Sequence, residues 1–253
     1  MTTAPPYPVG HGLLTGRTVL VTAAAGTGIG FATAKRCVEE GAKVVISDKH
    51  ERRLAESAAV LGVVGVPCDV TVEDDVARLF AAATAELGHL DVLVNNAGLG
   101  GTAEIVDMTD EQWHIVLDVT LTGTFRCTRA ALRHMLPRGA GVIVNNASVL
   151  GWRAQPGQAH YAAAKAGVMA LTRCAAMEAA GAGVRVNAVA PSLAMHPFLS
   201  KVTTEEVLAE LTEREAFGRP AEPWEVANVI VFLASEYSTY LTGEVVSVSS
   251  QHP

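Results

Sequence analysis

Short apolar runs alternate with longer, helix-like stretches along most of the chain. Runs such as 18–21 and 92–94 have the length and composition of buried strands. The segment 73–87 repeats apolar residues near a period of 3.6, which predicts an amphipathic helix. Regular alternation of short apolar strands with helices is typical of an α/β fold, in which helices cover both faces of a parallel sheet.

The same pattern predicts the order of the elements. Strands are expected at 18–21, 44–46, 63–66, 92–94, 141–144, 184–186 and 244–248. Helices are expected at 28–40, 51–60, 73–87 and 110–135, around Tyr161, and from about Pro223 onward. The 110–135 helix should end before Pro137, because proline lacks the N–H that a helix interior needs. The stretch 191–217 lacks either period and is expected to be irregular.

Length and composition favour one large domain. The chain has 253 residues, of which 49% are hydrophobic and 18% charged, so it can build a sizeable core and is too apolar for disorder. No linker or repeat interrupts the alternation, and residues 13–253 are expected to form a single doubly wound α/β domain. Residues 1–12 lack the charge and apolar pattern of a signal peptide and are expected to form a flexible arm.

Charge and cysteine content argue against several kinds of partner. The net charge of -7 argues against non-specific binding to nucleic acid. No apolar run approaches 18 residues, so no membrane span is expected. The cysteines lack metal-ligand spacing and are expected to be buried thiols of a cytoplasmic protein without a metal site: Cys37, Cys68, Cys127 and Cys174.

The strongest chemical signal is a tyrosine and a lysine four residues apart in a predicted helix. Tyr161 and Lys165, in Y-A-A-A-K, share one helix face at this spacing. A lysine cation beside a phenol favours the phenolate and moves the tyrosine pKa from about 10 toward neutrality. Ser148 follows the predicted strand 141–144, at the sheet edge where open parallel sheets bind ligands. An isolated Y-x-x-x-K also occurs by chance on solvated helices, so further motifs are needed.

A glycine-containing loop and a strand-ending aspartate supply that support. The loop from Thr22 to Gly30 joins the first strand to the first helix, where glycines let the backbone approach a pyrophosphate at the helix N-terminus. Asp48, which ends the second strand, favours NAD over NADP because a carboxylate there binds both ribose hydroxyls and repels a 2′-phosphate. The alternatives are an ordinary glycine-rich turn and a turn-forming aspartate. Lys49 and two arginines beyond it would weaken the NAD preference.

Together with the segment N-N-A-G at 95–98, these motifs resemble the short-chain dehydrogenase/reductase family across residues 16–248. The resemblance implies a Rossmann-like domain of about seven strands that transfers a hydride between a nicotinamide cofactor and a secondary alcohol or ketone. It implies that Tyr161 exchanges a proton with the substrate oxygen and that Ser148 hydrogen-bonds the same oxygen. Lys165 would bind the nicotinamide ribose and tune Tyr161.

The resemblance also assigns the cofactor site. Ala23 stands at the first glycine of the family pattern T-G-x-x-x-G-x-G, and Gly26 is expected to make the turn instead. Asp69 matches the residue that contacts adenine, and main-chain groups beside Pro191 would bind the carboxamide. The implied cofactor-binding residues are Thr22, Gly26, Gly28, Ile29, Gly30, Asp48, Asp69, Val70, Asn96, Ala97, Gly98, Tyr161, Lys165, Pro191 and Leu193.

Two positions depart from the family. Thr120 stands where many relatives have an asparagine that holds a water of the proton relay. Its hydroxyl can still bind a water, so a modified relay is expected with Thr120 as a catalytic candidate. After Pro191, the glycine and threonine of the family are replaced by Ser192 and His196. His196 is a further candidate, although lone histidines are more often structural.

The substrate is indicated only by composition and by similarity of short segments. Apolar residues near the pocket and the lid implied at 191–217 favour a bulky apolar alcohol or ketone, although lid residues also pack against one another. The segments T-A-A-A-G-T-G-I-G and D-V-T-L-T-G resemble bacterial members of steroid-ring breakdown, which act on hydroxy-indanone propanoyl-CoA compounds. The pocket residues are Leu150, Trp152, Leu193, Met195, Phe198 and Leu199.

Three further expectations follow from the resemblance. A 3-oxoacyl-thioester reductase is an alternative enzyme, although most such relatives prefer NADP, against which Asp48 argues. A non-enzymatic dinucleotide-binding regulator is the alternative from another class, supported only by Thr120 and the altered glycine loop. Family members are commonly homotetramers built on the helices near 110–135 and 160–180 and the last strand.

Overall fold

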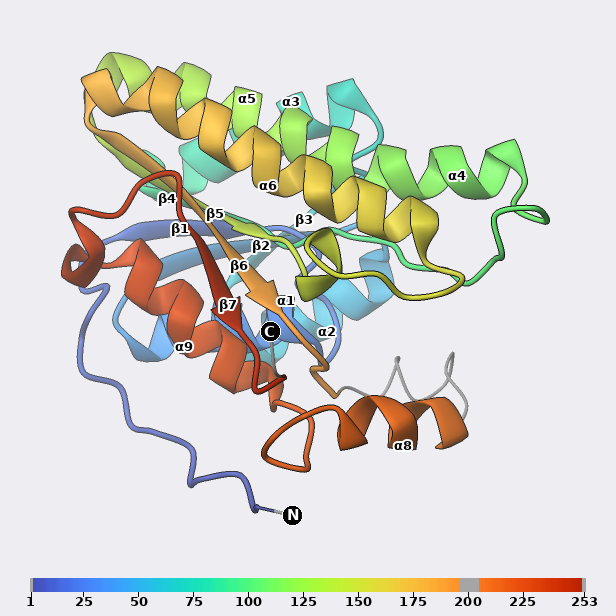
Figure 1. Cartoon of the computed structure of the whole chain (residues 1–253). Helices are drawn as coiled ribbons and strands as arrows, with labels where there is room; N and C mark the ends of the chain where they lie inside the picture. The colour runs from blue at the N-terminus through green and yellow to red at the C-terminus, as the bar shows by residue number, and fades with distance from the viewer. Residues whose placement is uncertain (1, 196–204, 252–253) are drawn as a thin grey trace.

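Seven parallel strands form one sheet at the centre of the structure, a computed structural model that describes residues 2–195 and 205–251 (Figure 1). The strand order is β3-β2-β1-β4-β5-β6-β7, so the chain winds outward from β1 in one direction and then from β4 in the other. This order confirms the predicted doubly wound, Rossmann-like α/β fold. The strands are β1 (Thr18–Val21), β2 (Lys43–Asp48), β3 (Val64–Pro67), β4 (Val92–Asn95), β5 (Gly141–Asn146), β6 (Val184–Pro191) and β7 (Val245–Val248).

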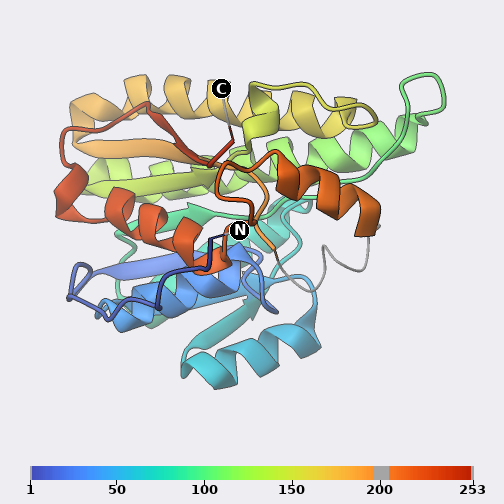
Figure 2. The ribbon, with the colours of Figure 1, turned by 60° about the horizontal axis from the view of Figure 1, so that its bottom comes forward.

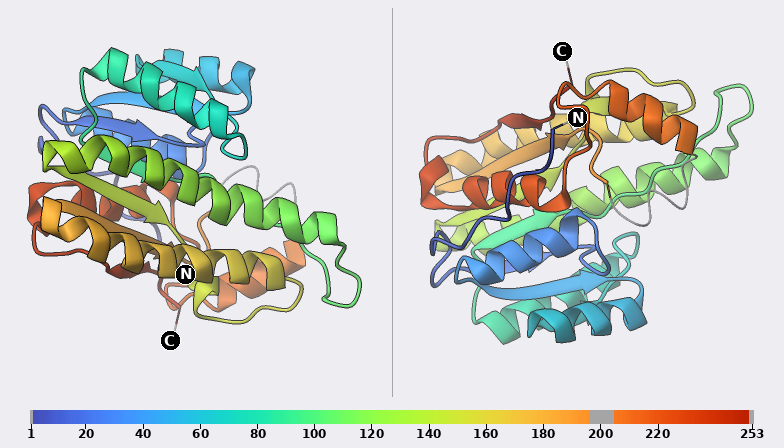
Figure 3. Two further views of the ribbon diagram at one scale, coloured as in Figure 1. Left: turned by 90° about the horizontal axis from the view of Figure 1, so that it is seen from above. Right: turned by 90° about the horizontal axis from the view of Figure 1, so that it is seen from below.

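Helices cover both faces of the sheet. The described helices are α1 (Ile29–Glu39), α2 (Glu51–Leu61), α3 (Glu73–Leu87), α4 (Asp110–Leu117), α5 (Gly123–Met135), α6 (Ala159–Ala179), α8 (Glu205–Glu213) and α9 (Pro223–Ala234). Helices α3 to α6 lie on one face, and α1, α2 and α9 lie on the other (Figure 3). Helix α8 lies apart from both layers, beyond the carboxyl-terminal end of β6 (Figure 1).

The two cores follow from the pleat of the strands, which sends successive side chains to opposite faces. On β1, Leu20 packs in the core beneath α3, α5 and α6, whereas Val19 and Val21 pack beneath α1, α2 and α9. All three side chains are fully buried. These apolar side chains hold both helix layers against the sheet. The loops at the strand ends carry polar side chains.

Two segments differ from the predicted elements. The segment predicted as one helix over 110–135 contains a π-helical turn, η1 (Asp118–Thr122), between α4 and α5. The stretch 191–217, predicted to be irregular, contains α8. Its sequence E-E-V-L-A-E-L-T-E is rich in strong helix formers, so local propensity supports this short helix.

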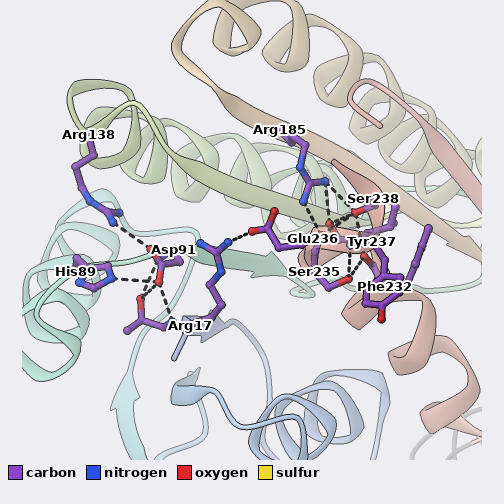
Figure 4. Close-up of polar contacts among 12 residues, drawn as sticks. Arg17, His89, Asp91, Arg138, Arg185, Phe232, Ser235, Glu236, Tyr237 and Ser238 are labelled. Atoms are coloured by element: carbon purple, nitrogen blue, oxygen red, sulfur yellow. Dashed lines mark hydrogen bonds and ion pairs between the residues drawn. The ribbon is translucent and has the colours of Figure 1, made fainter. Parts of the chain in front are cut away.

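Polar contacts join the loops at the amino-terminal edge of the sheet (Figure 4). Asp91 Oδ2 accepts from the N–H and the hydroxyl of Thr18, both at 3.1 Å, and Asp91 Oδ1 accepts from Arg138 Nη2 at 3.0 Å. Arg185 binds carbonyls at the C-terminal end of α9, including Ser235 O at 3.1 Å from its Nη2. The contacts of Asp91 join β1 to β4, and those of Arg185 join β6 to α9, at the edge opposite the predicted site.

The N-terminal residues, expected to form a flexible arm, contact the domain at several places. The Tyr7 ring meets the Trp224 ring edge to face at 5.5 Å, and its hydroxyl donates to Glu39 Oε2 at 2.6 Å. Thr2 N donates to Phe217 O at 3.1 Å, just beyond α8. Figure 2 shows the N-terminal segment running along the domain toward the region of α8.

The prediction that the cysteines are buried is confirmed for three of the four residues and is wrong for Cys174. Cys37, Cys68 and Cys127 are buried free thiols, and burial raises the pKa of Cys37 to about 12, which makes it unreactive. Cys174 is also free but exposed, because it lies on the outer side of α6. Within the described residues, no helix combines the length and apolar character needed to cross a membrane.

Candidate active site

The residues singled out in the sequence gather at the carboxyl-terminal edge of the sheet. Thr22 follows β1, Asp48 ends β2, Asn96 follows β4, Ser148 follows β5 and Pro191 ends β6. Because all seven strands are parallel, their carboxyl ends meet at one edge. Residues distant in the sequence are thus brought together by topology.

Ser148 and Tyr161 form a pair of hydroxyls in this edge. Ser148 is buried at the start of a short 3₁₀ turn, η3 (Val149–Gly151), and its Oγ accepts from Leu150 N at 3.2 Å. Tyr161 lies half-buried in the first turn of α6. Burial raises the pKa of Tyr161, and a hydrogen bond with Ser148 acts in the opposite direction. The two hydroxyls therefore lie close enough to contact one substrate oxygen.

Lys165 lies one helical turn beyond Tyr161 and is almost fully buried. Its Nζ donates to Asn146 O at 2.6 Å and lies 5.5 Å from the centroid of the Tyr161 ring. Burial lowers the pKa of Lys165 to about 8. The expected depression of the Tyr161 pKa is not found in the chain alone, because desolvation of the phenol outweighs any favourable effect.

Asn146 is a residue that the sequence analysis missed. Besides accepting from Lys165, it donates from Nδ2 to Asn96 Oδ1 at 2.9 Å, and Asn96 Nδ2 donates to Ala23 O at 2.9 Å. This chain of contacts connects the lysine of α6 with the glycine loop after β1. The sequence did contain one indication of its role: Asn146 is the last residue of β5, two positions before Ser148.

The glycine loop leads directly into α1. Gly28 is the N-cap of α1 and Ile29 its first residue, and Gly26 has a φ of 96°. A Cβ on Gly30 would lie 2.4 Å from both Ala23 O and Asn96 Nδ2, so only glycine fits there. Ala23, at the first glycine position of the family pattern, has a φ of 50°, in the left-handed region that favours glycine.

Thr22 joins this loop to the segment after β4. Its Oγ1 accepts from Asn96 N at 3.0 Å and from Ala97 N at 3.3 Å, and it donates to Val94 O at 3.4 Å. A Cβ on Gly98, the next residue of the segment, would lie 3.4 Å from Lys165 Nζ. The N-N-A-G segment thus spans from the glycine loop to the lysine.

The two aspartates predicted to bind the cofactor are both fixed by main-chain donors. Asp48 is buried, with Oδ1 accepting from His50 N at 2.9 Å and Oδ2 from Ala25 N at 3.3 Å. Asp69 Oδ1 accepts from the N–H and the hydroxyl of Thr71. Burial opposes ionisation of Asp69, but these bonds and the charges of Lys49 and Arg126 together outweigh it and hold its pKa below the usual range. Val70, beside it, is buried.

Thr120 lies in the π-helical turn and is fully buried. Its Oγ1 accepts from Leu99 N at 3.0 Å and donates to Leu99 O at 3.2 Å. A Cβ on Gly98 would lie 3.9 Å from the same oxygen. Thr120 therefore holds the segment after β4 beside Lys165, and its hydroxyl keeps one lone pair for a further donor.

In the turn after β6, the main-chain N–H and carbonyl of Leu193 are both hydrogen-bonded within the protein. Leu193 N donates to Glu215 Oε1 at 3.3 Å, and Leu193 O accepts from Ala221 N at 2.8 Å. The carbonyl keeps a second lone pair. Pro191 pairs with Val248 of β7. Three residues predicted near the pocket lie outside the described residues: His196, Phe198 and Leu199.

Comparison with known proteins agrees with this geometry. A family model described as enoyl-(acyl carrier protein) reductase matches residues 23–250. The chain is 64% identical over 261 residues to (5R,7aS)-5-hydroxy-7a-methyl-1-oxo-2,3,5,6,7,7a-hexahydro-1H-indene-carboxyl-CoA reductase of Mycobacterium tuberculosis, across 100% of this chain and 99% of that protein. It is 44% identical over 237 residues to cis-4-hydroxycyclohexanecarboxylate dehydrogenase of Sinomonas cyclohexanicum, across 92% of this chain and 94% of that one.

The solved structures agree as well. A crystal structure of a short chain dehydrogenase from Mycobacterium smegmatis superposes with a TM-score of 0.89, at 58% identity and over 99% of both chains. The chain therefore belongs to the short-chain dehydrogenase/reductase family and is an oxidoreductase that works with a nicotinamide dinucleotide.

Proposed function

We propose that the protein interconverts a secondary alcohol and a ketone, with Tyr161 exchanging the proton with the substrate oxygen. The observation that carries this proposal is the grouping of Ser148, Tyr161 and Lys165 at the carboxyl edge of the sheet. Ser148 hydrogen-bonds the same oxygen and holds it in line with Tyr161. The dinucleotide supplies or accepts the hydride when it is bound.

The loops of this edge fit a dinucleotide. Gly26 leaves open space beside the loop, since nothing lies within 4 Å of a Cβ built there, and Gly28 is the N-cap of α1, where free N–H groups would stabilise a pyrophosphate. Gly30 is buried and lets α1 begin close to Ala23 O and Asn96 Nδ2. The Lys165 ammonium, which binds Asn146 O in the chain alone, would donate to the nicotinamide ribose. Adenine and its ribose would lie near Asp69 and Asp48.

The decisive experiment replaces the phenolic hydroxyl alone. Tyr161→Phe is expected to bind NADH as tightly as the parent protein and to lose activity by at least about a thousandfold, because the proton donor is removed while the ring remains. Absorbance at 340 nm measures turnover and NADH fluorescence measures binding. A Tyr161→Phe protein that turns over at the parental rate would refute the assignment.

We propose NAD rather than NADP as the preferred cofactor. Asp48 supports this, because its buried carboxylate lies next to Ala25 of the glycine loop, where a 2′-phosphate would meet a negative charge. Lys49, Arg52 and Arg53 line a depression just beyond it and oppose the preference. The ratio of kcat/KM for NAD and NADP, compared with the same ratio in Asp48→Ser, tests the assignment.

We propose a fused-ring hydroxy or oxo compound, carried as a CoA thioester, as the substrate. Identity of 64% across the entire chain to the indene-carboxyl-CoA reductase supports this class. Apolar surface beside Ser148 supports it too: Leu150 is half-buried and Trp152 is 51% exposed. A panel of hydroxy-indanone CoA thioesters, cyclohexanols and linear 3-oxoacyl thioesters tests it. A higher kcat/KM on the linear thioesters would favour the acyl-thioester reductase instead.

We propose a homotetramer, in the cytoplasm, as the working form. Apolar side chains exposed on α4, α5 and α6 support association through these helices, since each would otherwise face water. Free thiols support a reducing compartment. Light scattering coupled to size exclusion measures the assembly. The exposed side chains are Ile115 on α4, Phe125 on α5 and Met177 on α6.

A further inference from the structure

A buried carboxylate outside the catalytic group connects four distant segments of the chain. Glu215 follows α8 and is 3% exposed. Its Oε1 accepts from Leu193 N at 3.3 Å and from Gln251 Nε2 at 2.9 Å, and its Oε2 accepts from Ser250 Oγ at 2.7 Å. Arg153, in the loop that follows Ser148, donates to the Gln251 side-chain oxygen.

Main-chain bonds complete the same network. Ala216 N donates to Ser250 O at 2.9 Å, so the C-terminal segment is fixed beside Glu215 by both backbone and side chain. Ser192 N donates to Val248 O at 3.2 Å. Leu193 therefore lies between β7 and Glu215, with its N–H directed at the carboxylate.

The energetics indicate a positioning role for this group. Removing a carboxylate from water is costly unless its oxygens are hydrogen-bonded. The three side-chain and main-chain donors to Glu215 in the described part of the chain are all neutral, and Arg153 reaches it only through Gln251. All three hydrogen bonds to the Glu215 carboxylate form only when Leu193, Ser250 and Gln251 keep one relative arrangement. The carboxylate therefore stabilises that arrangement.

We infer that Glu215 is a positioning residue that holds the turn after β6 in the conformation required by the nicotinamide half of the cofactor. The inference rests on the proposed function and on the family resemblance, which implies that main-chain groups beside Pro191 bind the carboxamide. Leu193 N donates to Glu215, so the carboxylate fixes the orientation of the peptide groups in this turn. Glu215 itself contacts neither cofactor nor substrate. It acts through the Leu193 main chain, and Arg153 extends the same network to the loop that carries Ser148.

The matched variants are Glu215→Ala and Glu215→Gln. The alanine removes all three hydrogen bonds. The glutamine keeps an acceptor oxygen for Leu193 N and Gln251 Nε2, and its amide donates to Ser250 Oγ after rotation of that hydroxyl. Glu213→Ala, an exposed glutamate two residues earlier, is the control.

The readout compares NAD with ADP-ribose, which lacks the nicotinamide. In Glu215→Ala, affinity for NAD is expected to fall about tenfold and kcat by a similar factor, as expected from loss of hydrogen bonds to a charged group. Affinity for ADP-ribose should stay within about twofold of the parent. Glu215→Gln should recover most of both losses, and Glu213→Ala should match the parent.

Two results would overturn the inference. One is an equal loss of NAD and ADP-ribose affinity in Glu215→Ala, which indicates general damage to the fold. The other is unchanged NAD affinity and kcat. Hydrogen exchange of the Leu193 amide in the cofactor-free protein adds a local readout: it should be faster in Glu215→Ala and near parental in Glu215→Gln. Failure of the proposed function would instead be seen in the parent protein, as absence of turnover with NAD.

Discussion

Ala23 stands at a position where the family pattern has glycine, and the loop still forms. It is the one non-glycine residue with a positive φ in the described part of the chain, at 50°. Its carbonyl accepts from Asn96 Nδ2, so tertiary contact holds the backbone there. For an alanine this conformation costs about 1–2 kcal/mol relative to the ordinary helical or extended regions.

Replacing Ala23 by glycine should therefore stabilise the protein. The variant removes the steric cost but adds about 0.4–1 kcal/mol of chain entropy to the unfolded state, which leaves a net gain of about 0–1.6 kcal/mol in the free energy of unfolding. Urea unfolding of parent and Ala23→Gly measures it. Ala25→Gly is the control, since Ala25 has no positive φ and should lose stability. A similar loss at both positions would contradict the assignment of strain to Ala23.

Lys165 gives a second residue-scale prediction, on the pH dependence of cofactor binding. Its pKa is lowered by burial to about 8, so the ammonium is present below that pH and is lost as the pH rises through it. If the ammonium donates to the nicotinamide ribose, affinity for NADH falls above about pH 8, by at most about tenfold per pH unit for one proton.

Fluorescence titration of NADH from pH 6.5 to 9.5 measures this dependence. Lys165→Met, which carries no titrating amine, should bind more weakly at pH 7 and show a flat profile across the same range. A parent protein whose NADH affinity is constant between pH 7 and 9.5 would show that the Lys165 charge does not contribute to binding.

At the scale of elements, the π-helical turn between α4 and α5 positions Thr120. Turns of this kind interrupt the regular hydrogen bonding of a helix and often mark functional sites. Here the turn directs the Thr120 hydroxyl at both main-chain groups of Leu99. The turn thereby fixes the loop after β4 against α6.

Thr120→Val is expected to lower the free energy of unfolding by about 1–2 kcal/mol, because the N–H and carbonyl of half-buried Leu99 lose their partner while the volume of the side chain is kept. Activity should fall as well, since Gly98 lies between Thr120 and Lys165. Thr122→Val, in the same turn and half-buried, is the control and should change stability by less than about 0.5 kcal/mol. Equal effects of the two variants would argue against a stabilising role of the Thr120 hydroxyl at Leu99.

Sequence patterns predicted these elements unevenly, for physical reasons. The strands and the long helices follow from hydrophobic period, which is a local property. The π-helical turn leaves no such mark, because Asp118–Thr122 continues an ordinary helical sequence. Asn146 and Glu215 were missed since their roles depend on contacts with Lys165 and Leu193, which lie far away in the chain. Short motifs indicated the proposed reacting groups, but not the residues that contact and position them.

At the scale of the whole molecule, the two edges of the sheet have different tasks. The carboxyl edge gathers the groups of the proposed reaction, several of them in energetically costly settings such as the buried Lys165. The amino edge contains polar contacts that join loops, as around Asp91 and Arg185. This separation predicts that damage at the amino edge lowers stability without altering the chemistry.

A substitution of Asp91 tests whether the amino edge contributes to stability alone. Burial opposes its ionisation, but hydrogen bonds from Arg138 and Thr18 and the charge of His89 outweigh burial and hold its pKa below the usual range. A carboxyl with a lowered pKa stabilises the fold above its unfolded pKa of about 3.9, and that contribution is lost as the pH falls through the folded value. Asp91→Asn should therefore cost about 2 kcal/mol of unfolding free energy at pH 7 and less at pH 3.5.

The measurement is urea unfolding of parent and Asp91→Asn at pH 7, 5 and 3.5, together with kcat and KM at pH 7. The expected result is a difference in stability that shrinks toward acid, with kcat and KM within about twofold of the parent, because Asp91 lies at the edge of the sheet away from Tyr161. A loss of kcat at full stability would show that the amino edge acts on the site. A stability difference that is constant with pH would show that the Asp91 charge is not what stabilises this edge.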